Sequence, residues 1–350
     1  MKELYPLLFE PNLKEVVWGG HNIQTWKRLP LSDNPIGESW EVSSVAPRVS
    51  IIANGASKGE DLNAFTRREG ARVLGNKVVA EYGDELPLLV KFIDAVNDLS
   101  IQVHPDDEMA HRYDLKRGKT EMWYILDADE GASVLVGFNR PVTAEEYAAR
   151  VADGTITEVL TRHLVRPGDV FYIPAGRVHA ICGGVRLAEI QQSSDITYRI
   201  FDYNRPGLDG KPRPLHTELA AEAIHYEVLT EYRTLYQEHF NRALPVVRSP
   251  YFDMRLLELT APIHRDMRKY DSFVVSICVE GKCLLRPRVD SQLAEVELNE
   301  GNSALIPMEI ANYDIVPLTP KVRILETFIN NMDRSLSAKF NRFFHISTQR

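Results

Sequence analysis

The stretch GDVFYIPAGRVH, residues 168–179, decides the fold. The apolar run from Val170 to Ile173 predicts a short strand, because β-branched and aromatic residues favour strands. The following Pro174-Ala-Gly176 predicts the turn that ends it, since proline and glycine interrupt regular structure. His179 comes directly after this turn. The segment is therefore typical of a strand and a turn that present a histidine.

A second stretch repeats this pattern near the other end of the chain. GNSALIPMEIAN, residues 301–312, has its glycine and its proline at the same offsets and also crosses one predicted strand. In this copy Glu309 replaces Gly176, and Asn312 replaces His179. The repeat suggests two copies of one β-unit, of which only the first retains the histidine.

Short β-type runs recur along the whole chain, separated by Gly, Pro, Asn and Asp. Many short strands with turns between them indicate a sandwich or a barrel. Helical patterns lie between the runs, and one of them begins at Thr143 with Glu146 completing a capping box. The other expected helices cover 62–69, 106–116 and 216–226. The predicted fold is mainly β with inserted helices.

The length of 350 residues allows two hydrophobic cores, because single cores seldom grow past ~250–300 residues. The stretch from 227 to 250 carries few strand signals and separates two β-rich regions. We therefore place a boundary near Arg242. The sequence predicts a first domain over 1–241 with helical insertions, and a second domain over 242–350.

Charge and composition narrow the classes of partner. A net charge of −8 without a long Lys/Arg block argues against nucleic acid and against an anionic membrane face. No apolar run approaches the ~20 residues that span a bilayer, and the N-terminus has no secretory pattern. Three cysteines without a CxxC pair suit a reducing compartment and argue against a thiolate metal site. We expect a cytoplasmic protein, either a monomer or a dimer.

Three stretches of the first β-region contain groups that could bind one metal ion. Their side chains are Gln102, His104, Glu121 and His179. Side chains two apart on a strand share a face, so Gln102 and His104 lie on the same side. Two imidazoles, a carboxylate and an amide oxygen suit zinc or another divalent first-row ion. For either histidine taken alone, an ordinary half-buried structural role is the simpler interpretation.

The joint spacing of these groups resembles the two-part signature of the cupins. The first part is modified to Gln102-x-His104 followed by Glu121, and the second part is complete from Gly168 to His179. The resemblance implies two jelly-roll domains, with a metal site in the first roll and none in the second.

Four segments together resemble one cupin family. They read SIQVHPDDEMAH (100–111), KTEMWYIL (119–126), PAGRVHAI (174–181) and SSDITYRIFDYNR (193–205), in this order. In spacing and residue type they are similar to the type I mannose-6-phosphate isomerases, in the shorter bacterial form, and the similarity runs over about residues 1–230. The long form's signature is absent. The resemblance implies a zinc enzyme with one ion per chain that interconverts mannose 6-phosphate and fructose 6-phosphate.

Carried over residue by residue, the resemblance assigns roles within the site. It implies zinc ligation by Gln102, His104, Glu121 and His179, and catalysis by Arg199 and Lys119. It implies that the substrate is lined by Trp18, Glu38, Ser100, Asp195 and Arg205.

The division of labour among these residues stays open. Lys119 could shuttle a proton, and Glu38 or Asp195 could be the base. Arg199 could face an enediolate oxygen or the phosphate. Each residue also has a simpler interpretation: a solvated lysine for Lys119, and an ion pair with Asp195 or Asp202 for Arg199. Trp18 could belong to the core.

Two other functions fit part of the pattern. Two histidines and one carboxylate also suit an iron-dependent cupin dioxygenase. A binding protein for sugar phosphates without turnover would keep the same pocket. Oxygen consumption with bound iron would indicate the dioxygenase, and binding without conversion would indicate the binding protein.

Overall fold

The computed structural model describes residues 3–288 and 295–332. Two compact units are present, one made of residues 12–40 and 88–234, the other of the described parts of 1–11, 41–87 and 235–350. We call them the metal-site unit and the second unit. Both draw on segments from more than one part of the chain, and the expected consecutive domains, 1–241 and 242–350, stay a prediction. In the described part of the chain no helix has the length and apolar character needed to cross a bilayer.

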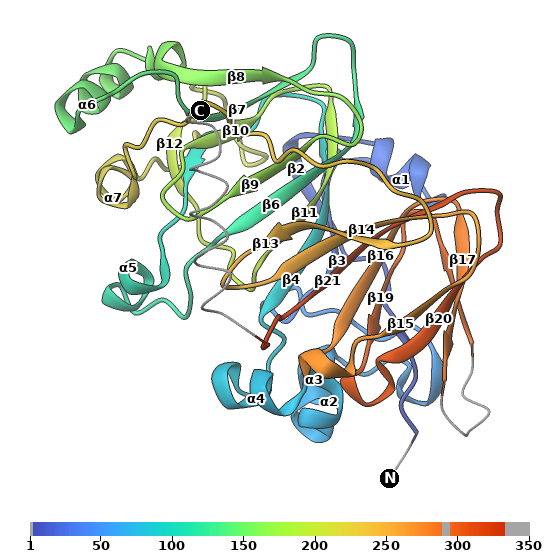
Figure 1. Ribbon diagram of the computed structural model, residues 1–350. Coiled ribbons are helices and arrows are strands. Elements are labelled where there is room, and N and C mark those ends of the chain that lie inside the picture. The colour runs from blue at the N-terminus through green and yellow to red at the C-terminus, as the bar shows by residue number, and fades with distance from the viewer. Residues whose placement is uncertain (1–2, 289–294, 333–350) are drawn as a thin grey trace, which may run out of the picture. The chain divides into compact units, whose positions relative to one another are not determined.

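The metal-site unit consists of two sheets whose strands differ in length (Figure 1). In spatial order, the larger contains β2 (Leu13–Gly20), β3 (Ile36–Val42), β4 (Leu88–Ala95), β11 (Val185–Gln192), β6 (Glu121–Ala128) and β9 (Val170–Ile173). The smaller contains β12 (Tyr198–Phe201), β5 (Ile101–Val103), β10 (His179–Ile181), β7 (Ser133–Phe138) and β8 (Leu160–Leu164).

The helices of this unit are α1 (Asn22–Trp26), α5 (Asp107–Arg112), α6 (Ala144–Ala152) and α7 (Thr217–Ala223), with the 3-10 turn η2 (Ile156–Val159). The predicted N-cap of α6 is confirmed, because the Thr143 side chain accepts a hydrogen bond from the Glu146 amide, whereas the Glu146 carboxylate pairs with Arg140 and Arg150 instead of completing the capping box. The helix expected over 106–116 is shorter and ends at Arg112. Asp114 lies beyond its end with a left-handed φ of 56°, which an α-helix cannot contain.

The helix expected over 216–226 is also shorter, and it ends at Ala223. Ile224 is extended and packs into the buried apolar cluster of this unit. The next amide, that of His225, donates to the carbonyl of Gly176 at 2.8 Å. The helix therefore ends at Ala223, because the next residues make tertiary contacts in place of helical hydrogen bonds.

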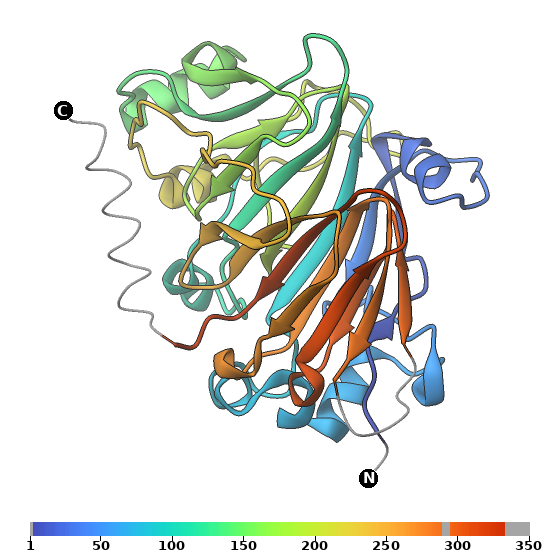
Figure 2. The ribbon, with the colours of Figure 1, turned by 45° about the vertical axis from the view of Figure 1, so that its right-hand side comes forward.

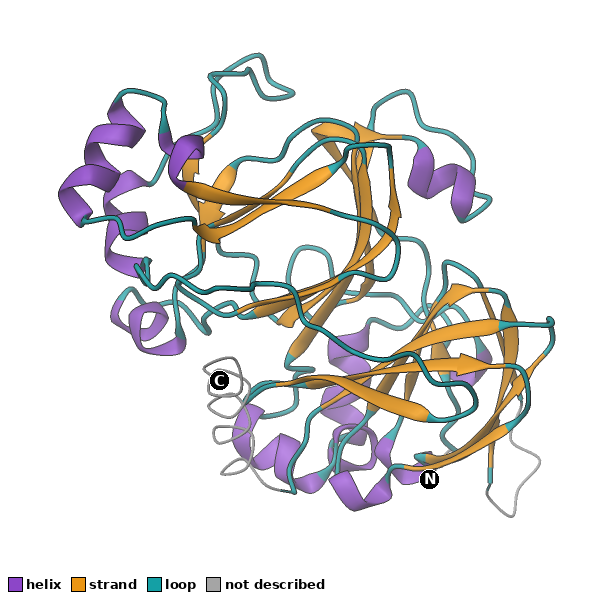
Figure 3. Cartoon of the chain, turned by 45° about the horizontal axis from the view of Figure 1, so that its top comes forward, coloured by secondary structure: helices purple, strands orange, loops and turns teal. Residues whose placement is uncertain are grey.

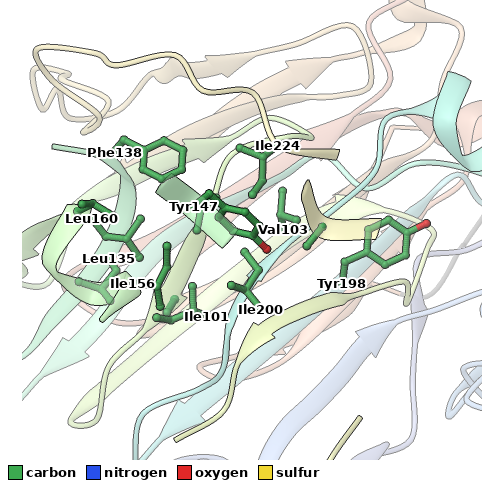
Figure 4. Close-up of a cluster of buried hydrophobic side chains, with 14 of the residues drawn as sticks. Ile101, Val103, Leu135, Phe138, Tyr147, Ile156, Leu160, Tyr198, Ile200 and Ile224 are labelled. Atoms are coloured by element: carbon green, nitrogen blue, oxygen red, sulfur yellow. The ribbon is translucent and has the colours of Figure 1, made fainter. Parts of the chain in front are cut away.

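One apolar cluster determines which way the strands of the smaller sheet face (Figure 4). Ile101 and Val103 of β5 and Tyr198 and Ile200 of β12 all pack into it. Because successive residues of a strand point to opposite faces, the residues between them point away from this cluster. That alternation determines the direction of the site residues described below.

The second unit also contains two sheets, whose orange-to-red strands lie side by side in Figure 2. In spatial order, one contains β1 (Leu7–Leu8), β19 (Ser303–Ile306), β16 (Val274–Glu280), β21 (Val322–Phe328), β14 (Asp253–Leu259) and β13 (Ala243–Arg248). The other contains β15 (Ile263–Asp266), β20 (Asn312–Pro317), β17 (Lys282–Pro287) and β18 (Val296–Asn299).

Short helices complete the second unit: α2 (Leu62–Glu69), α3 (Ala71–Leu74), α4 (Asn76–Tyr82), and the 3-10 turns η1 (Gly55–Ser57), η3 (Arg268–Tyr270) and η4 (Met308–Ile310). In each unit the helices lie at the margins of the strands (Figure 3). The helix predicted over 62–69 is confirmed with these bounds, and the Asp61 side chain caps it by accepting from the Ala64 amide.

Both copies of the sequence repeat have the expected course. The first runs from β9 through the turn to β10, and the second runs from β19 through η4 to β20. Gly176 in the first copy has a φ of 83°, and a Cβ there would meet the His225 ring at 2.6 Å. The second copy replaces this tight turn with the 3-10 turn that contains Glu309. The two copies therefore share the strands and differ at the turn.

Candidate metal centre and active site

The register of three short strands brings site residues into one row. His179 of β10 pairs with Gln102 of β5, and Gln102 pairs with Arg199 of β12. Cross-strand partners share a face, so these three side chains lie on the same side of the smaller sheet. It is the side opposite to the apolar cluster of Figure 4. Glu121 comes from the larger sheet, as the first residue of β6.

The turn after β9 holds the ligand-bearing segments together. The Gly176 amide donates to the His104 carbonyl at 2.9 Å, and the Ala175 amide donates to Thr120 Oγ1 at 3.2 Å. The Lys119 amide donates to the Pro105 carbonyl at 3.0 Å. The predicted turn therefore does more than end a strand. It connects the three segments that carry His104, Glu121 and His179.

His104, Glu121 and His179 form a buried triad. Their candidate ligand atoms all lie within 4.8 Å of one another. His104 Nε2 is 3.3 Å from Glu121 Oε2, and His179 Nε2 is 3.4 Å from Glu121 Oε1. Within the described residues no other group of three or more His, Cys, Asp or Glu side chains meets in this way. The prediction that these three side chains converge is confirmed.

The protonation of the triad suits a metal cation. Burial lowers the pKa of both imidazoles, and Lys119 lowers that of His104 further, to about 3. His179 Nδ1 lies 2.8 Å from the Arg177 carbonyl and donates to it, which leaves the lone pair on Nε2 facing Glu121. Burial opposes ionisation of Glu121, yet Lys119 and His104 hold its pKa well below the usual range. Two neutral nitrogens and one anionic oxygen are the ligands that divalent first-row metals prefer.

Gln102 lies beside the triad. Its side-chain Nε2 is 3.2 Å from His179 Nε2. Because amide oxygen and nitrogen are assigned from their surroundings, rotation of the amide by 180° would turn Oε1 to the same point. The structure thus brings all four predicted ligands together, and the residues present fit a metal ion.

Lys119 is buried against the triad. Its Nζ lies 2.9 Å from Glu121 Oε2 and 3.1 Å from His104 Nε2, and only 4% of the residue is exposed. The simpler interpretation of a solvated lysine is therefore wrong. Lys119 places a cation directly beside two of the ligand atoms.

A second set of charges involves Glu38 and Asp195. Lys14 Nζ is 3.0 Å from Glu38 Oε1 and 3.9 Å from Asp195 Oδ2, and Lys91 Nζ is 3.6 Å from one oxygen of each carboxylate. Burial opposes ionisation of Glu38, but Lys91 and Lys14 lower its pKa to about 2. The two predicted substrate-lining carboxylates are thus brought together by two lysines.

Sequence reasoning missed two members of this site, Lys91 and Glu189. They face each other across β4 and β11, with Lys91 Nζ 3.5 Å from Glu189 Oε1. Glu189 Oε2 also accepts a hydrogen bond from Trp123 Nε1 at 3.2 Å. Trp123 packs edge-on against His179, with ring centroids 5.3 Å apart. The available sign was a charged residue inside each of the apolar stretches LLVKFI (88–93) and LAEI (187–190), because such residues are seldom buried without a partner.

The other predicted residues lie in several places. Trp18 is buried in an apolar cluster with Trp123, which agrees with its interpretation as a core residue. Ser100 is buried immediately before β5. Arg199 Nη1 donates to the Pro214 carbonyl at 2.9 Å. Arg205 forms an ion pair with Asp202 at 2.9 Å, so the structure groups it with Asp202 rather than with the triad.

A jelly-roll-like pair of sheets with a buried two-histidine, one-carboxylate triad defines the class of metal-binding cupins. The model of the catalytic domain of type I phosphomannose isomerase matches residues 7–136. Mannose-6-phosphate isomerase ManA of Bacillus subtilis is 33% identical over 313 residues, covering 89% of this chain and 95% of that protein. The mannose-6-phosphate isomerase of Streptococcus mutans is 36% identical over 219 residues, or 63% of this chain and 67% of that protein.

Solved structures agree with these relatives. The mannose 6-phosphate isomerase of B. subtilis matches with a TM-score of 0.79 and 28% identity, over 93% of this chain and 99% of that one. A variant of phosphomannose isomerase from Salmonella typhimurium, at 17% identity, matches with a TM-score of 0.74 and shows the shared fold. The chain belongs to the type I mannose-6-phosphate isomerase family.

Proposed function

We propose that this protein is a zinc-dependent isomerase that interconverts mannose 6-phosphate and fructose 6-phosphate. The observation that carries the proposal is the buried triad of His104, Glu121 and His179 with the Lys119 ammonium 2.9 Å from Glu121. An enediol mechanism needs a proton carrier and stabilisation of a developing oxyanion. The triad and its neighbouring cations offer both. We infer the substrate, a phosphorylated hexose, from membership of the family.

The zinc ion would be held by His104, Glu121, His179 and Gln102. A bound divalent ion polarises and orients sugar oxygens and supplies several kcal/mol of charge stabilisation. Zinc suits the nitrogen and oxygen set and brings no redox chemistry. Gln102 is the ligand that we expect to exchange most readily, because an amide oxygen is a weaker donor than an imidazole or a carboxylate.

Among the residues of the chain, Lys119 and Arg199 are the proposed catalytic cations. Lys119 Nζ is already placed between a carboxylate and an imidazole, so it can pass a proton between the substrate and its neighbours. Arg199 shares the face of Gln102 and offers a fixed charge with a forked set of donors. Glu38 and Asp195 are the proposed carboxylate bases, and ion pairs with Lys91 and Lys14 orient both.

The buried cations also favour an anionic sugar over an apolar oxygenase substrate. Lys91 and Lys119 are each only 3–4% exposed, and a charge is seldom buried without a functional or structural partner. An apolar oxygenase substrate would gain nothing from these ammonium groups. The cytosolic location and the choice between monomer and dimer stay predictions.

The test combines metal analysis with a coupled assay. Protein purified without added metal is analysed for zinc and iron, and formation of fructose 6-phosphate is followed with and without chelator. We expect about one zinc per chain, loss of activity on chelation and its return with zinc. Lys119→Gln should abolish turnover while zinc stays bound. Bound iron with substrate-dependent oxygen uptake would refute the proposal, and so would substrate binding without conversion.

A further inference from the structure

A loop after β12 gathers arginines that the proposed mechanism does not yet use. It leaves the strand at Asp202, turns through a Gly207 to Lys211 hydrogen bond of 2.7 Å and returns to β12 at Arg213. Pro206 and Pro212 form a bridge across the loop. The returning segment is tied to the strand, since the His216 amide donates to the Arg199 carbonyl at 2.8 Å.

Asp202 organises two guanidinium groups inside this loop. Arg205 donates to Asp202 Oδ1 through Nε at 3.1 Å and Nη2 at 2.9 Å. Arg213 donates through Nε to Oδ2 at 2.7 Å and through Nη2 to Oδ1 at 2.6 Å. The side chain of Asp202 is only 5% exposed, whereas those of Arg205 and Arg213 are 20% and 23% exposed. The Asp202 carboxylate thus accepts hydrogen bonds from Nε and Nη2 of each guanidinium group, and Nη1 of either arginine takes no part in these bonds.

Arg199 completes the group. Its Nη1 donates to the Pro214 carbonyl at 2.9 Å, next to Arg213 in the chain. Its Nε is buried and has no hydrogen-bond partner in the described part of the chain. Burial lowers the pKa of Arg199, and the positive charge of Arg213 lowers it further. Asp202 opposes this decrease, but Arg205 adds to it, so the negative charge near Arg199 does not balance the positive charges around it.

The charge of this cluster differs from that of the lysine cluster near the triad. Arg199, Arg205 and Arg213 contribute three positive charges and Asp202 one negative charge, which leaves a surplus of two. The lysine cluster has Lys14 and Lys91 against three carboxylates, those of Glu38, Glu189 and Asp195. Of these two clusters, only the arginine cluster has an excess of positive charge. An incoming anion is therefore attracted to the arginine cluster rather than to the lysine cluster.

The position of the cluster suits one part of the substrate. Arg199 is the cross-strand neighbour of Gln102, so the cluster begins beside a candidate metal ligand and continues along the chain into the loop after β12. In a hexose 6-phosphate the reacting carbons C1 and C2 lie at one end and the phosphate at the other. A phosphate monoester is close to a dianion at neutral pH and pairs with guanidinium forks through parallel hydrogen bonds.

We propose that Arg213, oriented by Asp202, binds the substrate phosphate together with Arg199 and Arg205 and so determines specificity for phosphorylated sugars. This assignment rests on the proposed isomerase function. It makes Arg213, which lies outside the four sequence motifs, a binding residue, and it makes Asp202 a positioning residue.

The test replaces Arg213 and measures phosphate binding apart from turnover. The affinity for inorganic phosphate is measured by isothermal titration calorimetry on zinc-loaded protein, and KM and kcat for mannose 6-phosphate are measured alongside. For Arg213→Gln we expect both the phosphate Kd and KM to rise about ten-fold or more, as loss of one charge-assisted bond implies. The value of kcat should fall far less. Arg213→Lys should recover part of the affinity, because it keeps the charge but not the fork.

Arg166→Gln is the matched control, since Arg166 lies in the same unit with its side chain 87% exposed. It should leave all three values unchanged. An unaltered phosphate Kd in folded Arg213→Gln would overturn the inference, as would a wild type that binds no phosphate. A loss of kcat, zinc and melting temperature together, with no rescue by Arg213→Lys, would show a purely structural role. Arg213-dependent phosphate binding without isomerisation would instead refute only the proposed function.

Discussion

At the scale of single residues, His179 illustrates how one side chain is prepared for metal binding. Its Nδ1 is held by the Arg177 carbonyl at 2.8 Å, so the imidazole has one tautomer and one orientation. Its counterpart in the second copy of the repeat, Asn312, begins β20 in the second unit. The two copies therefore share their strands, but only the first places a candidate metal ligand after its turn.

We predict that His179→Ala loses zinc and activity together, because one of the three triad ligands disappears. Activity should fall by at least about a hundred-fold, given that even outer-shell changes cost 10–100-fold. Asn312→Ala should leave zinc content and turnover nearly intact. The measurements are metal analysis and the coupled assay on both variants. A wild-type zinc content in His179→Ala would show that the metal site is misplaced.

His104 leads to a prediction for the metal-free protein. Burial and Lys119 depress its pKa to about 3 in the folded state, against an ordinary value near 6.5. Between these values the unfolded chain binds a proton that the folded chain does not, so stability falls as pH decreases from 6.5 toward 3. The slope from this one group approaches ~1.4 kcal/mol per pH unit.

Urea unfolding of metal-free protein at several pH values measures this effect. His104→Gln should show a shallower decline of stability below pH 6.5 than the wild type. His111→Gln changes an exposed histidine of α5 and serves as the control with the wild-type slope. Identical slopes for the wild type and His104→Gln would contradict the assignment of a buried neutral imidazole.

At the scale of elements, the row of charges across β3, β4 and β11 shows how strands position a site. Lys91 in β4 is 3% exposed and faces Glu189 in β11 directly. Glu38 in β3 and Asp195 in the loop before β12 complete its surroundings. A charge in such a place is stable only because partners from several strands compensate its desolvation.

Lys91→Met should destabilise the protein by about 3–5 kcal/mol, because Glu189 then loses its ion pair with Lys91 while Glu38 and Asp195 keep only Lys14. The double variant Lys91→Met with Glu189→Gln should recover part of this loss, since it removes one of the stranded negative charges. Urea unfolding of the wild type, the single variants and the double variant makes up a double-mutant cycle. Strictly additive effects would mean that Lys91 and Glu189 do not interact.

At the scale of the whole molecule, the N-terminal segment belongs with strands from the other end of the chain. Leu7 and Leu8 form β1, which pairs with Leu305 and Ala304 of β19. Leu7 is fully buried in the second unit. The sheet of that unit is therefore completed only when residues about 300 positions apart meet.

Leu7→Ala should accordingly destabilise the second unit by about 2–5 kcal/mol through the cavity it leaves. Zinc content should not change, because the triad belongs to the metal-site unit. Leu31→Ala, at a leucine that is 65% exposed, is the matched control with little effect. Urea unfolding and metal analysis check both statements. A loss of zinc without a loss of stability would contradict this account of β1.

Local patterns in the sequence predicted much of this protein. Apolar runs and turn residues indicated the β-rich fold, and Asp61 and Thr143 indicated two helix starts that the structure confirms. The spacing of His104, Glu121 and His179 predicted that they converge. The β-runs and helix starts follow from alternation and capping, which act over short stretches of chain, whereas the convergence of the triad was inferred from the resemblance to the cupin signature.

Tertiary structure alone decided the rest. The ends of α5 and α7, the pairing of β1 with β19 and the charge partners of Lys91 depend on segments that are distant in sequence. The convergence of Arg199, Arg205 and Arg213 on one loop depends likewise on how that loop closes. Burial and long-range contacts select these arrangements, and the free energy they contribute is not encoded in any one local pattern.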